Sequence, residues 1–185
     1  MKVGIVSGRF QTLHLKHIEY ILAAKMRCER LYIGIEMSDE AYVAQLDEEA
    51  RAAWKRENPL TYIERHEMLA QALLEFGMEK TEFDMIPFPV HYPEYVLQYV
   101  PQSAIYFIGL STQLDRQKRR TLEKLGVKVE VLWKRNKEQR GITEKEVLDM
   151  IVNDGKWEQH VPKSTAKYMK KEKLVSKIKD LAVES

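Results

Sequence analysis

The chain has 185 residues, of which 44% are hydrophobic and 31% charged, enough for one well-buried core and too little for two independent domains. The formal net charge of +2 is too small for a protein that grips a nucleic-acid backbone. No run approaches the roughly 20 apolar residues that a membrane helix needs. We therefore predict a single domain over residues 1–185 that binds neither nucleic acid nor membrane.

The lone cysteine, Cys28, excludes an internal disulfide, and residues 1–5 are too short and too strand-like for a signal peptide. These features predict a cytoplasmic protein.

Strand-like and helical patterns alternate along most of the chain. Buried strands are predicted over residues 2–6, 30–35, 83–86, 104–108 and 127–133, and helices over 14–26, 61–77, 93–100 and 115–125. Such alternation implies right-handed crossovers and a parallel sheet, so the predicted fold class is α/β, a Rossmann-like sheet of about five strands flanked by helices. Ligands of these sheets bind beyond the carboxyl ends of the strands, at the topological switch point.

Two further segments lie outside this alternation. The polar stretch 37–57 is predicted to be an insertion or lid, with helix-forming character around residues 46–56. Residues 143–153 and 163–183 are predicted to form two C-terminal helices. Their apolar faces would permit a homo-oligomer.

The end of the first strand carries the most informative chemistry. Residues 7–11, SGRFQ, break the strand, and His14 and His17 follow at a predicted helix start. A helix N-terminus presents unpaired N–H groups and a partial positive charge, so histidines at i and i+3 there can share one polyphosphate with the backbone. The pattern predicts a nucleotide-phosphate site whose first members are Ser7, Gly8, Arg9, Phe10 and His17.

An isolated HxxH pair is more often structural than catalytic, and only the preceding Gly8-Arg9 favours function here. A zinc site is not expected, because no carboxylate or thiolate stands at suitable spacing. No metal ligated by side chains is predicted.

Three segments carry a resemblance to a known family. Residues 8–17, GRFQTLHLKH, resemble the GRFQPxHxGH signature of nicotinamide-nucleotide adenylyltransferases within the cytidylyltransferase-like superfamily. Residues 58–65, NPLTYIER, are similar to the family's NPFTxxER element. Residues 155–163, GKWEQHVPK, are similar to the GxxWxxLVP stretch of archaeal-type members. The resemblance covers nearly the whole chain in the same order.

The resemblance implies that a phosphate oxygen of an acceptor attacks the α-phosphate of a nucleoside triphosphate and releases pyrophosphate. Such transfer depends on positioning and charge stabilisation, so Arg9, His14, Lys16 and His17 are the predicted catalytic residues. A Mg²⁺ ion bridging the phosphates is expected, held largely by water and phosphate oxygens rather than by a carboxylate cage.

Two departures from the family pattern leave alternatives open. Lys16 replaces a glycine between the histidines, and either narrows the pocket or supplies a point charge to a phosphate. The family's ISGTEIR-like motif appears as residues 142–148, ITEKEVL, with Leu148 at the arginine position. Either Arg140 or Lys145 substitutes for that arginine, or the helix is displaced, or the chemistry is lost or changed. Arg140, Thr143 and Lys145 are thus predicted nucleotide-binding residues.

Acceptor binding is assigned to Gln11, Arg65 and Trp54. The alternatives to acceptor binding are that Arg65 is a solvated surface charge and that Trp54 only packs against its neighbours. The long 37–57 insertion points to an acceptor other than nicotinamide mononucleotide.

Three functional classes follow. The first transfers AMP from ATP to nicotinamide mononucleotide or a similar phosphorylated acceptor. The second is a cytidylyltransferase that uses CTP and another phosphate or phosphonate acceptor. The third is a degenerate nucleotide-binding protein.

Overall fold

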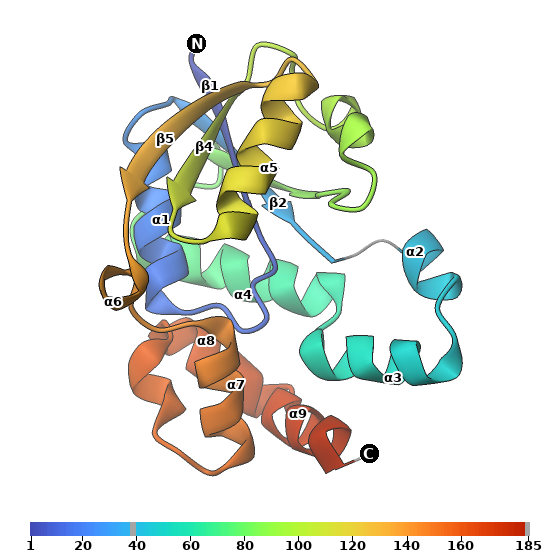
Figure 1. Cartoon of the computed structure of the whole chain (residues 1–185). Helices are drawn as coiled ribbons and strands as arrows, with labels where there is room; N and C mark the ends of the chain where they lie inside the picture. Colours follow the sequence, from blue (N-terminus) through green and yellow to red (C-terminus); the bar gives the residue numbers. More distant parts are fainter. Residues whose placement is uncertain (38–39, 184–185) are drawn as a thin grey trace.

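The computed structural model describes residues 1–37 and 40–183, and within them five parallel strands form one sheet in the order β3-β2-β1-β4-β5 (Figure 1). The strands are β1 (Val3–Gly8), β2 (Arg30–Ile35), β3 (Phe83–Pro87), β4 (Ile105–Leu110) and β5 (Lys128–Lys134). The predicted α/β class and Rossmann-like sheet are confirmed. β1 runs two residues beyond its predicted end, so Ser7 and Gly8 belong to the strand.

The two faces of the sheet bury separate cores, as the alternation of side chains along a strand requires. Val6 points to a core that it shares with α1 (Leu15–Lys25) and α4 (Tyr62–Glu75). Its neighbour Ile5 points to the opposite core, beneath the 3₁₀ helix η1 (Pro93–Gln98) and α5 (Gln113–Lys124). The helices lie within a few residues of their predicted bounds. The predicted cap of α4 is present, because Thr61 Oγ1 accepts from the backbone N–H of Glu64.

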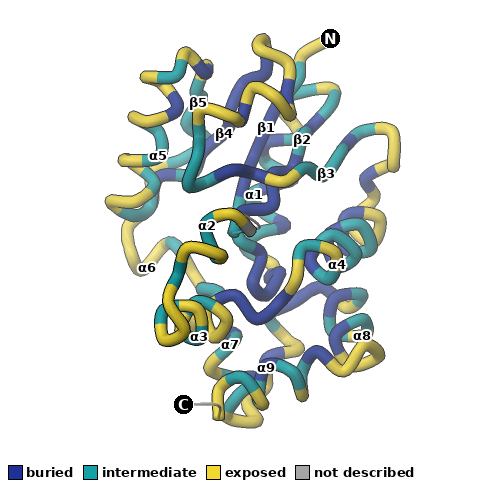
Figure 2. The backbone as a smooth tube through the Cα atoms, turned by 90° about the vertical axis from the view of Figure 1, so that its right-hand side faces the viewer, coloured by how far each residue is buried: buried dark blue, intermediate teal, exposed yellow. Residues whose placement is uncertain are grey.

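The predicted insertion contains α2 (Glu40–Ala44) and α3 (Glu48–Glu57), while residues 38–39 lie outside the described part of the chain. Figure 2 shows α3 as a largely exposed helix beside the C-terminal helix α9 (Leu174–Val183). The segment thus extends away from the sheet toward the C-terminus.

The C-terminal third packs below the carboxyl end of the sheet as α7 (Glu144–Val152), the 3₁₀ helix η2 (Trp157–His160), α8 (Lys163–Lys171) and α9 (Figure 1). The prediction of one helix over 163–183 was wrong. The chain breaks at Lys173, whose φ of 56° is left-handed, and the break turns both Met169 and Leu174 into the core. Residues 134–140 contain the short helix α6 (Lys137–Arg140), and the side chain of its N-cap residue Asn136 accepts from the backbone N–H of Gln139. None of the described helices combines the length and apolarity needed to cross a bilayer.

Candidate functional site

A cavity of about 460 Å³ opens where β1 and β4 lie side by side and the strand order reverses direction. This is the topological switch point at which doubly wound sheets bind their ligands. The loops after β1 and β4 form two walls, and the α6–α7 segment closes the third side. The cavity brings together most of the predicted site residues, namely Ser7, Gly8, Arg9, His14, Lys16, His17, Arg140, Thr143 and Lys145.

The two histidines form one unit at the start of α1. His14 is the N-cap residue, and its backbone N–H donates to Nδ1 of His17 at 3.3 Å. Because Nδ1 of His17 accepts, its Nε2 carries the proton and faces the cavity. Burial, together with the Arg9 guanidinium, lowers the pKa of His17 to about 3. Burial and the neighbouring His17 lower the pKa of His14 to about 2, so both imidazoles are neutral at pH 7.

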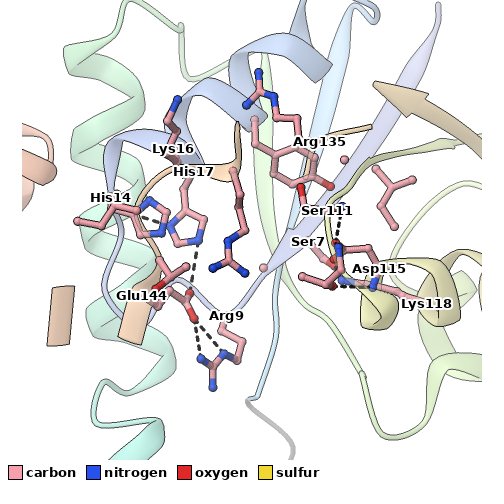
Figure 3. Close-up of a pocket in the computed structure, with 18 of the residues that line it drawn as sticks. Ser7, Arg9, His14, Lys16, His17, Ser111, Asp115, Lys118, Arg135 and Glu144 are labelled. Carbon is pink, nitrogen blue, oxygen red and sulfur yellow. Dashed lines mark hydrogen bonds and ion pairs between the residues drawn. The ribbon is translucent and has the colours of Figure 1, made fainter. Parts of the chain in front are cut away.

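Arg9 is held by a carboxylate from the far end of the chain (Figure 3). Its Nε and Nη2 atoms lie 2.9 and 2.8 Å from Oε2 of Glu144, the first residue of α7. Oε1 of Glu144 accepts from the backbone N–H of Gln11 at 3.0 Å and lies 3.4 Å from Nε2 of His17. We did not predict Glu144 as a site residue. Its place in the sequence could have indicated a role, because Glu144 stands where the ISGTEIR-like motif has a glycine.

A second polar group lies across the cavity from the histidines (Figure 3). Lys118 of α5 reaches Ser7 Oγ at 2.6 Å and also pairs with Glu36, while Ser7 Oγ lies 2.7 Å from the Tyr106 hydroxyl. We call Ser7, Glu36, Tyr106 and Lys118 the Lys118 cluster. Lys118 is directed into the cavity, although it stands in the charged run Lys118-Arg119-Arg120 of α5.

A tryptophan and an arginine at the end of β5 complete the wall between these groups. Trp133 packs so closely on Gly109 that a Cβ there would lie 2.6 Å from its Nε1. The guanidinium of Arg135 covers the indole at 4.1 Å from the ring centroid and pairs with Glu19 at 2.6 Å. Trp133 thus lines the cavity.

Comparison with known proteins identifies the family to which this chain belongs. No protein-family model matches the chain. It is 32% identical over 167 residues to phosphonoformate cytidylyltransferase of Streptomyces viridochromogenes, with 90% of each chain covered. It is 31% identical over 186 residues to the nicotinamide-nucleotide adenylyltransferase of Thermococcus onnurineus, covering 98% of this chain and 89% of the relative. The corresponding enzyme of Pyrococcus furiosus is 32% identical over 190 residues, covering 98% and 90%. The chain belongs to the archaeal-type nicotinamide-nucleotide adenylyltransferase family. It is a nucleotidyltransferase, as the resemblance predicted.

Solved structures agree with the fold of this nucleotidyltransferase. A bifunctional NMN adenylyltransferase/ADP-ribose pyrophosphatase from Francisella tularensis superposes with a TM-score of 0.66 at 14% identity, over 97% of this chain and 52% of that one. An adenylyltransferase-like structure from Vibrio parahaemolyticus, described as a nicotinate-nucleotide enzyme, gives a TM-score of 0.57 at 9% identity over 95% and 96% of the chains.

The α6–α7 segment of the nucleotidyltransferase brings Arg140 to the cavity wall, whereas Leu148 stands at the position of the motif arginine. Leu148 packs against the main core instead. The Nε atom of Arg140 is buried and makes no hydrogen bond among the described residues. Lys145 also lines the cavity, although it is exposed and pairs with Asp149 at 3.3 Å.

Lys16 lies along this same segment. Its Cε would be 2.7 Å from a Cβ on Gly141, so the glycine makes room for the lysine side chain. Nζ of Lys16 pairs with Glu19 at 2.8 Å. Lys16 therefore fills space at the rim and also brings a cation there.

Two predicted residues support the cavity without lining it. Phe10 is fully buried and meets the His17 ring edge to face, with centroids 5.0 Å apart. Gln11 is also fully buried, and its side-chain amide donates to the carbonyl of Leu60 and accepts from its N–H at 2.9 and 2.8 Å. Gln11 thus joins the loop after β1 to the NPLT element.

The other two predicted acceptor residues lie elsewhere. Arg65 is 1% exposed, and burial lowers its pKa to about 10. Its guanidinium is occupied by backbone carbonyls, donating to residues Arg9, Glu36, Met37 and Thr61. Trp54 lines a second cavity of about 700 Å³ between α3, the start of α4 and α9. The solvated alternative for Arg65 is therefore wrong, and Arg65 lines this second cavity together with Trp54.

Proposed function

We propose that this nucleotidyltransferase transfers the AMP group of ATP to nicotinamide mononucleotide or a similar phosphorylated acceptor and releases pyrophosphate. The observation that carries the proposal is the meeting of Arg9, the neutral His14–His17 pair and Arg140 around one cavity at the switch point. The nicotinamide-nucleotide adenylyltransferase relatives of near-complete coverage support this choice of substrates.

The chain's own residues have separate roles in this reaction. Arg9, Arg140 and Lys145 bind the triphosphate oxygens as cations, together with the N–H groups at the start of α1. The Nε2–H of His17 donates to the α-phosphate. The approach of phosphate charge raises the pKa of an imidazole, so His17 strengthens this hydrogen bond as negative charge accumulates. An acceptor phosphate oxygen forms the new bond to the α-phosphorus while the bond to pyrophosphate breaks, without a protein nucleophile.

A Mg²⁺ ion fits the reaction as a partner of the phosphates. Among residues 1–37 and 40–183, no three His, Cys, Asp or Glu side chains are grouped to hold a metal. The carboxylates of Glu36, Asp115 and Glu144 line the cavity without forming a group, so the phosphates and water would supply most of the ligands. When bound, the ion neutralises charge on the triphosphate.

We assign the acceptor anion to the side of the cavity that holds the Lys118 cluster. Lys118 is the cation on that wall, and it lies beside the hydroxyl of Ser7, across the cavity from His17. An acceptor held there meets the α-phosphate from the side opposite the histidines. In-line displacement needs this separation of acceptor and leaving group.

A second candidate is transfer of CMP from CTP to a small phosphonate or phosphate acceptor. It is favoured by the cytidylyltransferase relative, which matches this chain as closely in identity as the adenylyltransferases do. The residues of the Lys118 cluster contact one another directly, so a small anion would be in reach of both Lys118 and Ser7.

Pyrophosphate release decides between these functions. Purified protein would be assayed with Mg²⁺ and either ATP or CTP, against nicotinamide mononucleotide and a panel of small phosphates and phosphonates. We expect release with ATP and nicotinamide mononucleotide. Release only with CTP and a phosphonate would establish the second candidate. If no pyrophosphate is released while nucleotide binding is retained, the chain is a degenerate nucleotide-binding protein.

A further inference from the structure

We propose that Glu144 is an internal competitor of the nucleotide: its carboxylate occupies the triphosphate position in the empty enzyme, and the incoming phosphates displace it. The inference rests on the proposed function, because it assigns the triphosphate to Arg9 and His17.

The contacts of Glu144 are those expected of a bound phosphate. Both oxygens are used, one on the side-chain fork of Arg9 at 2.8 and 2.9 Å, the other on the backbone N–H of Gln11 at 3.0 Å and near Nε2 of His17 at 3.4 Å. An arginine fork, a backbone N–H and an imidazole are the donors that bind a phosphate oxygen. The side chain of Glu144 is only 12% exposed, so it fills the centre of this group.

Helix capping does not account for this arrangement. The N-terminus of α7 is capped by Thr143, whose Oγ1 accepts from the N–H of Glu146, while the Glu146 carboxylate accepts from the N–H of Thr143. Glu144 makes its hydrogen bonds and ion pairs to the segment 9–17, which is distant in sequence. Its role therefore concerns that segment.

Two consequences follow for nucleotide binding. In the empty enzyme Glu144 neutralises Arg9 and keeps the guanidinium near the histidines. When a triphosphate enters, Arg9 and Gln11 exchange one anion for another, and Glu144 must leave the corner because two anions cannot share it without strong repulsion. Glu144 thereby keeps Arg9 in place beside the histidines before nucleotide binds, and it lowers the affinity for nucleotide.

Removing the carboxylate should strengthen phosphate binding. The isosteric variant Glu144→Gln and the smaller Glu144→Ala would be titrated calorimetrically with inorganic tripolyphosphate, without metal, and with ATP and CTP in Mg²⁺. We expect both variants to bind tripolyphosphate about tenfold more tightly than the wild type. Glu146→Gln is the matched control, because it removes the same charge from the same helical turn without touching Arg9. It should bind within about twofold of the wild type.

Weaker or unchanged tripolyphosphate binding in both variants, at wild-type melting temperature, would overturn the inference. Loss of nucleotide affinity confined to the Mg²⁺ titration would overturn it as well and would make Glu144 a metal ligand. Binding to tripolyphosphate needs no turnover, so the test is separate from the proposed function. A wild type that turns over while Glu144→Gln gains no affinity refutes only the inference, and tighter binding in a protein without transferase activity refutes only the function.

Discussion

The rings of His14 and His17 lie stacked, with their centroids 3.7 Å apart and their planes 17° from parallel. The stacking covers one face of the His17 ring, and the hydrogen bond from the His14 backbone holds its Nδ1 edge. These contacts hold Nε2 of His17 toward Glu144 and the cavity. Preorganised donors of this kind stabilise charge in the transition state without reorganising.

Replacing His17 should abolish turnover and spare most of the nucleotide affinity. For His17→Ala we expect kcat to fall about 1,000-fold, the size of the loss when one preorganised donor is removed. Nucleotide binding should weaken less than tenfold, because Arg9 and Arg140 remain. Steady-state kinetics and calorimetry measure the two quantities. His66→Asn, on α4 and away from the cavity, is the control. Unchanged turnover in His17→Ala would remove the catalytic assignment.

The buried histidines should make the fold sensitive to mild acid. Their folded pKa values, about 2 and about 3, lie below the ordinary value of 6.5. Between these limits the unfolded chain binds more protons than the folded one, so the free energy of unfolding falls as the pH drops below about 6.5. Urea unfolding from pH 7.5 to pH 5 should show this decline. A His14→Gln/His17→Gln variant should show a flatter profile, and an equally steep profile would reject the histidines as its cause.

Arg140 should supply the charge that the motif arginine supplies in the family. We expect Arg140→Ala to weaken triphosphate binding about tenfold, since a charge-assisted contact is lost. Lys137→Ala removes a cation from the same short helix but not from the cavity wall, so its affinity should match the wild type. Equal triphosphate affinities for Arg140→Ala and Lys137→Ala would show that another cation binds the triphosphate.

Lys118 should govern the acceptor rather than the nucleotide. In Lys118→Met we expect the KM for the acceptor to rise about tenfold or more, with little change in the KM for the triphosphate. The neighbouring variant Arg119→Met removes a charge that pairs with Glu123 on the helix surface, and its kinetics should be unchanged. An effect on the triphosphate KM alone would move Lys118 to the nucleotide side.

Arg65 should matter for stability, because its guanidinium donates to four backbone carbonyls. Arg65→Leu leaves the carbonyls of Arg9, Glu36, Met37 and Thr61 without this donor, and we expect about 2–4 kcal/mol lower free energy of unfolding. Urea denaturation measures the loss, and Arg116→Leu on exposed α5 should lose less than about 0.5 kcal/mol. A stable Arg65→Leu protein with a raised acceptor KM would restore the original acceptor assignment.

Periodicity was sufficient to predict the sheet and most helices. β2 matched its predicted bounds, because the apolar run at 30–35 is flanked by clear polar breaks. The division of the last helix could not be predicted. Residues 163–183 keep a helical pattern throughout, and the left-handed turn at Lys173 depends on how Met169 and Leu174 pack in the core.

The cavity residues between Ser7 and His17 could be grouped from the sequence, because they follow one another along the first strand and helix. Glu144 and Lys118 were missed for a different reason. Each belongs to a helix that carries several charged residues, and a run of charges does not reveal which one faces inward. The same limit explains Arg65, because its carbonyl partners Arg9, Glu36 and Met37 belong to the loops after β1 and β2, which meet α4 only in the folded chain.

The pairing of Arg9 with Glu144 joins positions 135 residues apart. During synthesis the sheet strands β1 to β4 and helix α1 leave the ribosome long before α7 does. A nascent chain that ends before residue 140 lacks the third wall of the cavity and both Arg140 and Glu144. The enzyme therefore acquires a closed binding site only in the last stage of translation, and fragments cut within β5 or α6 should be inert even where the sheet has formed.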